Sequence, residues 1–121
     1  MKPIVINGDL WRVVRVTPDD PRLIDRTGTM RIATADSESK VISIALNVMP
    51  PLLDKVLLHE IAHAVTMSHG MLDPLRAVLP DDFHVIVEEW NAQVIENHSI
   101  EITALASESL GRPVCVDGLC F

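Results

Sequence analysis

A five-residue segment of the sequence combines metal-ligating and proton-accepting side chains at a spacing suited to zinc. His59 and His63 are four residues apart, and Glu60 follows the first of them, giving the pattern H-E-x-x-H. On an α-helix, residues four apart lie about 40° apart around the axis and about 6 Å along it, so both imidazoles can reach one ion. A catalytic zinc ion takes three protein ligands and leaves a fourth position to water, from which Glu60 could accept a proton. The segment therefore predicts a metal site, although chance could also place a glutamate between two exposed histidines.

A site of this type needs a third protein ligand, and we expect Glu89 to supply it. Three positions after Glu89 comes the small residue Ala92, as in gluzincins, where a small side chain at that position lets two helices approach. The neighbouring Glu88 could take the same role. Either glutamate could instead lie on an exposed helix surface, as most do. The expected metal ligands are therefore His59, His63 and Glu89.

His69 is the main alternative as third ligand. It falls ten residues after His59, as the third histidine does in the metzincin pattern H-E-x-x-H-x-x-G-x-x-H. That pattern has glycine where this chain has Thr66, a β-branched residue poorly suited to a turn with positive φ. His84 and His98 remain as further candidate ligands.

The motif must sit on a helix to work, and the sequence predicts one from Leu52 to about Ser68. Pro50-Pro51 suits the first turn of a helix and Gly70 suits its end. Apolar residues at helical spacing share the face opposite the two histidines. They are Leu57, Ile61, Ala64 and Val65. We expect this apolar face to pack on a sheet and the histidines to face a cleft.

The first 46 residues predict the sheet, because short runs of β-branched residues alternate with turn residues. The turn Asn7-Gly8-Asp9 favours a hairpin, since Asn-Gly readily adopts positive φ. The segment from Thr17 to Thr27 is expected to be a loop, and Ala35 to Lys40 a turn. The expected strands are Ile4 to Ile6, Leu10 to Val16, Thr29 to Thr34, and Val41 to Leu46.

Helices are expected after the strand-rich part. Asp81-Asp82 could cap a second helix running to about Asn97, and Ser99 could cap a third that reaches Leu110. Strands first and helices afterwards predict an α+β fold with a small, mostly antiparallel sheet of three or four strands. The whole chain, 1–121, is expected to form one domain, with a strand-rich part at 1–46, a helical part at 50–110 and a tail at 111–121.

Composition narrows the classes of partner. The chain has 17 acidic and 10 basic residues and a formal charge of −7, so we expect no nucleic-acid partner. No run approaches the roughly 18 apolar residues of a membrane span, and the first residues lack the apolar region of a signal peptide. A cytoplasmic location without membrane contact is therefore expected. Cys115 and Cys120 are too few for a four-ligand zinc finger, which favours free thiols or a local disulfide.

The chain resembles the compact gluzincin-like metallopeptidase domains of bacterial and phage genomes, related to the ImmA/IrrE peptidases and the SprT-like zincins. The resemblance rests on the hairpin around Trp11, Asp20-Pro21-Arg22-Leu23, Val41 to Leu46, Leu57 to Ala64 and Val87 to Ala92. It implies a minimal zincin fold, cleavage of a protein substrate, and a glutamate ligand at the position of Glu89. This chain differs from the ImmA-like pattern at Gln93, and it lacks a basic extension of the kind that would bind DNA.

The expected function is a zinc-dependent metallopeptidase that hydrolyses a peptide bond in a specific protein or peptide substrate. We expect the substrate to lie against the strand Val41 to Leu46, taken as an edge strand. The chain has no tyrosine to stabilise an oxyanion. His84, His98 and Arg76 are the candidates for that role. The alternative is a zinc-binding interaction or assembly module of phage or prophage type with little or no hydrolytic activity.

Overall fold

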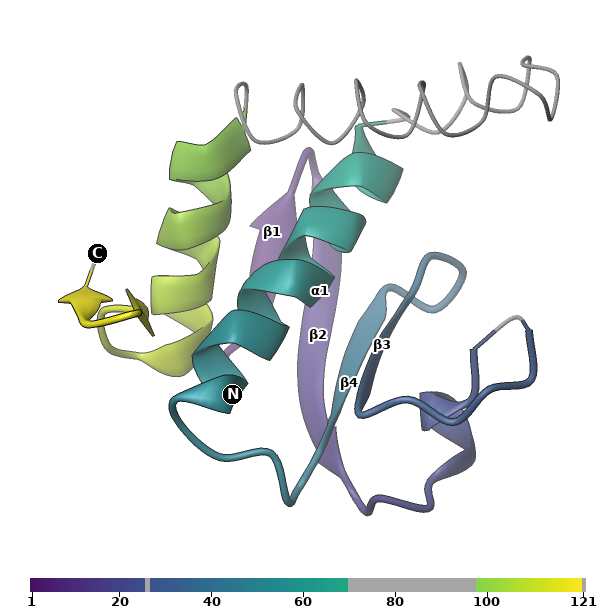
Figure 1. Cartoon of the computed structure of the whole chain (residues 1–121). Helices are drawn as coiled ribbons and strands as arrows, with labels where there is room; N and C mark the ends of the chain where they lie inside the picture. Colours follow the sequence, from purple (N-terminus) through teal and green to yellow (C-terminus); the bar gives the residue numbers. More distant parts are fainter. Residues whose placement is uncertain (26, 70–97, 121) are drawn as a thin grey trace, which may run out of the picture.

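A four-stranded sheet and two helical segments form most of the chain that the computed structural model describes, which is residues 1–25, 27–69 and 98–120. The strands are β1 (Ile4–Ile6), β2 (Asp9–Val16), β3 (Ala33–Asp36) and β4 (Val41–Ala45). Helix α1 (Leu52–Ser68) crosses one face of the sheet, and the helical segment 98–110 lies beside it near β1 (Figure 1). The expected α+β fold is confirmed. The helix expected from Asp81 to Asn97 lies outside the described residues.

The hairpin expected at Asn7-Gly8 joins the first two strands. Asn7 has φ 47° and Gly8 has φ 83°, the positive values that a two-residue turn of type I′ requires. Strands β1 and β2 are antiparallel, with Ile6 opposite Asp9. Asn-Gly therefore sets this register. Asn tolerates the left-handed backbone region better than most residues, and Gly adopts it readily because it has no Cβ.

The sheet has the order β1-β2-β4-β3, with one parallel pair at its centre. β2 and β4 run parallel, with Val13 opposite Ile42, and the other two pairs are antiparallel. The expectation of a small, mostly antiparallel sheet is therefore confirmed. The expectation that the strand at Val41 is an edge strand is wrong, because β4 lies between β2 and β3, and the free edge on that side belongs to β3.

The third strand lies farther along the chain than the sequence indicates. Instead of Thr29 to Thr34, β3 runs from Ala33 to Asp36. The preceding residues are held in their own loop by Asp25, whose carboxylate accepts hydrogen bonds from the backbone N–H groups of Thr27 and Thr29 and from Nε of Arg31. These hydrogen bonds pair the backbone N–H groups of Thr27 and Thr29 within the loop. The strand therefore begins only after this loop.

The loop between β2 and β3 covers the face of the sheet opposite α1. It contains a short 3-10 helix, Pro21–Leu23, capped by the Asp20 carboxylate, which accepts from the backbone N–H of Arg22. Leu23 is fully buried, and Thr34 Oγ1 donates to the carbonyl of Arg22 at 2.6 Å. All five residues of β4 are consequently buried.

Helix α1 has the bounds that the sequence predicts, Leu52 to Ser68. The four apolar residues of its expected face, Leu57, Ile61, Ala64 and Val65, each have 0% exposure. At the end of the helix, Trp11 Nε1 donates to Ser68 Oγ at 2.7 Å, and Asn7 Nδ2 donates to the Ser68 carbonyl at 3.0 Å. The β1–β2 hairpin therefore fixes how far α1 extends along the sheet.

The C-terminal part packs back on both β1 and α1. Segment 98–110 is already helical at residue 98, so Ser99 is not its cap as expected. Its Ser109 carbonyl accepts from the backbone N–H of Lys2 at 2.9 Å. The tail forms a small hairpin of β5 (Cys115–Val116) and β6 (Leu119–Cys120), joined by a disulfide between Cys115 and Cys120. Of the readings for the two cysteines, the local disulfide is the one observed.

Asp54 links the first turn of α1 to this tail. Its side chain is 3% exposed, and its two oxygens accept from both terminal nitrogens of Arg112, at 2.8 and 2.9 Å. It also accepts from the backbone N–H of Cys115 at 2.8 Å. The carboxylate lies near the N-terminus of the helix, where the helix dipole favours a negative charge.

Among the described residues, no helix is long and apolar enough to cross a membrane.

We predict that Asp54→Asn lowers the free energy of unfolding by about 1–3 kcal/mol near neutral pH, because it weakens hydrogen bonds to a charged group. The hydrogen bonds from Arg112 lower the pKa of Asp54 below its ordinary 3.8, against the opposing effect of burial. Its contribution is therefore present above about pH 4 and lost as the pH falls through the lowered pKa, so variant and wild type should converge in acid. Urea denaturation at neutral and acid pH measures both effects.

The matched control is Asp117→Asn, since Asp117 pairs with Lys55 on the same helix but is 77% exposed. We expect this variant to change stability by less than about 0.5 kcal/mol. Equal losses in the two variants would show that Asp54 has no special role.

Candidate metal centre

His59 and His63 project from the same side of α1 and meet at their tips. Their Nε2 atoms lie 3.1 Å apart, and the rings meet edge to face with centroids 4.7 Å apart. A tetrahedral ion with bonds of about 2.0–2.1 Å to nitrogen separates its ligand atoms by about 3.3 Å. The two imidazoles therefore already have about the spacing that one zinc ion requires. The packing of α1 on the sheet holds the backbone of both residues in place.

Glu60 lies beside this pair but is much less exposed. Its exposed fraction is 7%, and burial raises the pKa of its carboxyl group to about 7 from an ordinary 4.5. The pKa of His63 is lowered, first by burial and then by the nearby His59. A lowered pKa keeps His63 neutral near pH 7, which is the form that binds a metal. A carboxyl group that titrates near neutral pH is suited to exchange protons with a reacting molecule.

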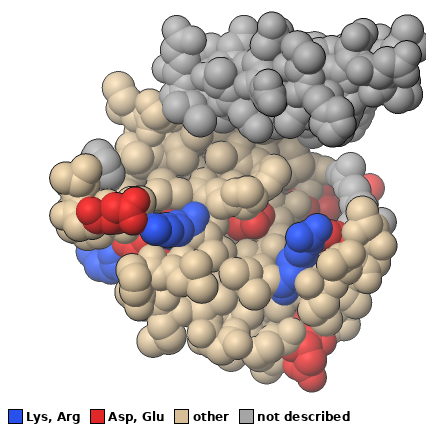
Figure 2. All heavy atoms as spheres, in the orientation of Figure 1, with Lys and Arg blue, Asp and Glu red and all other residues tan. Residues whose placement is uncertain are grey.

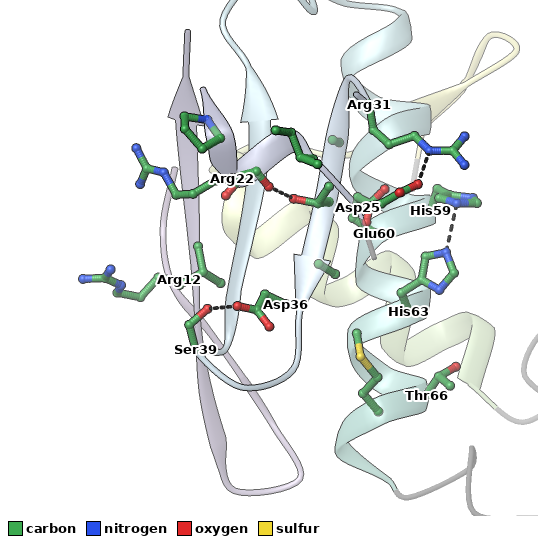
Figure 3. Close-up of a pocket in the computed structure, with 18 of the residues that line it drawn as sticks. Arg12, Arg22, Asp25, Arg31, Asp36, Ser39, His59, Glu60, His63 and Thr66 are labelled. Carbon is green, nitrogen blue, oxygen red and sulfur yellow. Dashed lines mark hydrogen bonds and ion pairs between the residues drawn. The ribbon is translucent and has the colours of Figure 1, made fainter. Parts of the chain in front are cut away.

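All three side chains line one cleft with a volume of about 990 Å³. Figure 3 shows α1 on one side of this cleft, β3 and the loop before it on the other, and the two histidines on the open side of the helix. The expectation that the histidines face a cleft therefore agrees with the structure. A cleft of this size is in the range that binds small molecules or a short peptide segment.

The edge of the sheet formed by β3, which pairs with no further strand among the described residues, runs along the cleft. Ala45 N–H donates to the Ile32 carbonyl at 2.9 Å, so the backbone of Ile32 points toward β4. In an antiparallel strand this direction alternates, so the N–H and C=O groups of Ala33 and Ala35 point away from β4. Both alanines line the cleft. Their small side chains leave room for an extended chain to approach the edge.

Arg31 is a residue of the cleft that sequence reasoning missed. Its Nε donates to Asp25 Oδ2 at 2.7 Å, and the side chain is 57% exposed. In Figure 3 its guanidinium extends toward the side of α1 that bears His59, with the terminal nitrogens beyond the Asp25 contact. No local pattern marks this arginine, because only the Asp25 loop and the packing of β3 against α1 bring it there.

The candidate third ligands fall into two groups. Glu89, Glu88 and His84, together with the oxyanion candidate Arg76, lie outside the described residues. His69 and His98 are described, and neither lines the cleft. They lie instead against Glu101. Within the described ranges, no third ligating side chain gathers with His59 and His63.

The chain was compared with protein-family models, with curated proteins and with solved structures, and none of the three comparisons found a match.

We predict that ionisation of Glu60 costs stability when the protein is treated with a chelator. Because the folded state raises this pKa from 4.5 to about 7, the free energy of unfolding should fall as the pH rises across that interval and stay low above it. Glu60→Gln cannot ionise, so it should be more stable than wild type above pH 7, by about 2–4 kcal/mol.

Denaturation curves at pH 5, 6 and 8 in the presence of EDTA test this directly. The exposed Glu108 offers a control, since Glu108→Gln should leave the pH dependence of wild type unchanged. Parallel stability profiles for wild type and Glu60→Gln would contradict the prediction.

Proposed function

We propose that this protein is a zinc-dependent metallopeptidase that hydrolyses a peptide bond in a specific protein substrate. The observation that carries the proposal is the 3.1 Å separation of the His59 and His63 Nε2 atoms beside the buried Glu60, at a cleft bordered by a free strand edge. Glu89 is proposed as the third ligand on the basis of the resemblance to gluzincins described above.

The two imidazole nitrogens of His59 and His63 have the spacing that a tetrahedral zinc ion needs. With Glu89 as the proposed third ligand, they would complete a donor set that catalytic zinc sites use. When bound, zinc would supply a Lewis acid that polarises a carbonyl group and makes water more acidic. Glu60 would hold the proton removed from the attacking water and later deliver it to the leaving amine. Its place next to His59, in the cleft that both histidines line, serves this role, since a base must lie beside the water that it deprotonates.

We propose that the substrate backbone binds along the edge of β3. An extended peptide can add a strand there and pair with the outward N–H and C=O groups of Ala33 and Ala35. Backbone pairing gives affinity without regard to sequence, so the side chains along the rest of the cleft would set specificity. This position replaces the one expected on β4, which is covered on both sides.

Arg31 is the residue that we propose to stabilise the oxyanion of the tetrahedral intermediate. Its contact with Asp25 through Nε orients the guanidinium and leaves the terminal N–H groups directed along the cleft edge (Figure 3). A preorganised cation at the site of developing charge lowers the barrier without further reorganisation. Arg31 would thus take the role that a tyrosine takes in many zincins.

A protein substrate fits the charge of the chain better than a nucleic acid. The formal charge is −7, which repels a phosphate backbone overall. Figure 2 shows one face on which uncharged side chains predominate and the positive groups are scattered instead of forming a stripe. Neither feature favours nucleic acid, so we propose a protein or peptide partner.

Two substitutions test the metal and the base separately. His63→Ala should lose the zinc ion of the cleft and so bind one ion fewer than wild type, whereas Glu60→Gln should keep that ion and lower turnover by at least about 10²-fold, because only proton transfer is removed. Zinc is measured by elemental mass spectrometry, and turnover on a fluorogenic peptide library. Glu108→Gln is the control and should match wild type.

Undiminished turnover in Glu60→Gln would exclude Glu60 as the base. A zinc ion that His63→Ala loses, without turnover of any peptide by wild type, would favour the alternative function, a zinc-binding interaction module.

Arg31 has a close match in Arg22, which makes a controlled comparison possible. Both arginines pair with an aspartate in the same loop, and their side chains are 57% and 56% exposed. Arg22 also lines the cleft, but it extends on the far side of β3 from the histidines (Figure 3). We expect Arg31→Ala to lower kcat by about 10²–10³-fold with a smaller change in KM, and Arg22→Ala to leave kcat within about threefold. Equal effects in the two variants would show that Arg31 acts only on the loop.

A further inference from the structure

A second group of ligand-type side chains lies away from the cleft, where the end of α1 meets segment 98–110. It consists of His69, His98 and Glu101, one ligand atom of each lying within 4.8 Å of the others. His69 Nε2 is 3.5 Å from Glu101 Oε1, and His98 Nδ1 is 2.9 Å from Glu101 Oε2. The two contacts reach different oxygens of Glu101, so an ion would draw the three ligand atoms, which lie within 4.8 Å of one another, toward the separation of about 3.3 Å on tetrahedral zinc.

Two different elements bring these residues together. His98 and Glu101 are three residues apart on one helix, so they share a face. His69 is the C-terminal cap of α1, and it is separated from Glu101 by 32 positions in the sequence. The imidazoles of His69 and His98 are only tilted relative to each other, with centroids 4.8 Å apart, so that both rings present a nitrogen to the carboxylate. The side chains are 27%, 19% and 34% exposed for His69, His98 and Glu101, which leaves access for an ion.

This group is separate from the pair His59 and His63. Six residues along a helix correspond to about 9 Å of rise and a large rotation around the axis, which takes His69 away from the ion that His63 could bind. Consistent with this, His69 and His98 do not line the cleft. The metzincin arrangement, with His69 as third ligand to the same ion, therefore does not match the described geometry.

We propose that His69, His98 and Glu101 form a second binding site for a divalent transition-metal ion of the zinc type. Two imidazoles and one carboxylate are ligands that zinc accepts, and three protein ligands leave a fourth position for water or another group. The ion would join the end of the helix that bears the H-E-x-x-H motif to segment 98–110. Its role would therefore be to hold these two elements together, in addition to any chemistry at the cleft.

The number of zinc ions bound per chain tests this site independently of the proposed function. We expect equilibrium dialysis of the untagged chain against zinc chloride to give two ions for wild type, one for His63→Ala and one for the double variant His69→Ala/His98→Ala. Zinc added to His63→Ala should raise its Tm, because an ion that binds only the folded state stabilises it. Neither the ion count nor the change in Tm depends on turnover of a substrate.

A milder variant guards against loss of folding. Glu101→Gln keeps the size of the side chain and its ability to accept a hydrogen bond, and we expect it to weaken the second ion at least about tenfold while the first is retained. Glu108→Gln on the same helix is the control and should bind two ions.

Any other number of bound ions would count against the cleft site or against the second site. One ion in wild type that only the His63 substitution removes would overturn the second site and leave the proposed function standing. One ion lost in both His63→Ala and His69→Ala/His98→Ala would indicate a single shared site and also overturn it. One ion lost only when His69 and His98 are replaced would support the second site and remove the metal basis of the proposed function.

Discussion

The burial of one face of α1 against the sheet is the constraint from which the arrangement of the candidate metal centre follows. Leu57, Ile61 and Val65 are fully buried among the strands, and a helix that buries this stripe has a fixed rotation about its own axis. His59 and His63 must then project away from the core, while Glu60 lies near the boundary between core and cleft. Any rotation that exposed Glu60 more would also move apolar side chains into water, at a cost of about 25 cal/mol for each Å² of apolar surface.

The position of α1 along the sheet is fixed by polar contacts at its two ends. Asp54 holds the first turn to the tail through Arg112, and Ser68 is held by Trp11 and Asn7 of the hairpin. Hydrogen bonds are directional, whereas apolar packing tolerates sliding, so these contacts specify a register that burial alone would leave open. A pair of ligands held on such a helix needs little reorganisation to receive an ion, which is the requirement for a preorganised site.

The electrostatics of Glu60 differ in kind from those of three aspartates in the described chain, one of which, Asp25, lines the same cleft. Asp54, Asp20 and Asp25 are carboxylates whose pKa is lowered by hydrogen bonds from arginine or backbone and hydroxyl donors. Glu60 is the opposite case, because burial raises its pKa and, within the part of the chain that the structure describes, no hydrogen bond or cation offsets the effect. A fold that keeps such a group forgoes stability at that position, and strained or costly groups of this kind gather at functional sites. This contrast supports Glu60 as the reactive carboxylate.

Local physics explains what the sequence by itself determined. The pairing of His59 with His63 depends only on helical geometry, and the first hairpin depends on the backbone preferences of Asn7-Gly8. The bounds of α1 follow from Pro50-Pro51 and Gly70 in the sequence, and its buried face follows from apolar spacing. The parallel pairing of β2 with β4, the place of β3 at the edge and the approach of Arg31 to the histidines were decided by the tertiary structure, because each depends on contacts between residues far apart in the chain. The same holds for the gathering of His69, His98 and Glu101, since no helical or strand period relates His69 to the other two. Glu89 remains a prediction of sequence and resemblance.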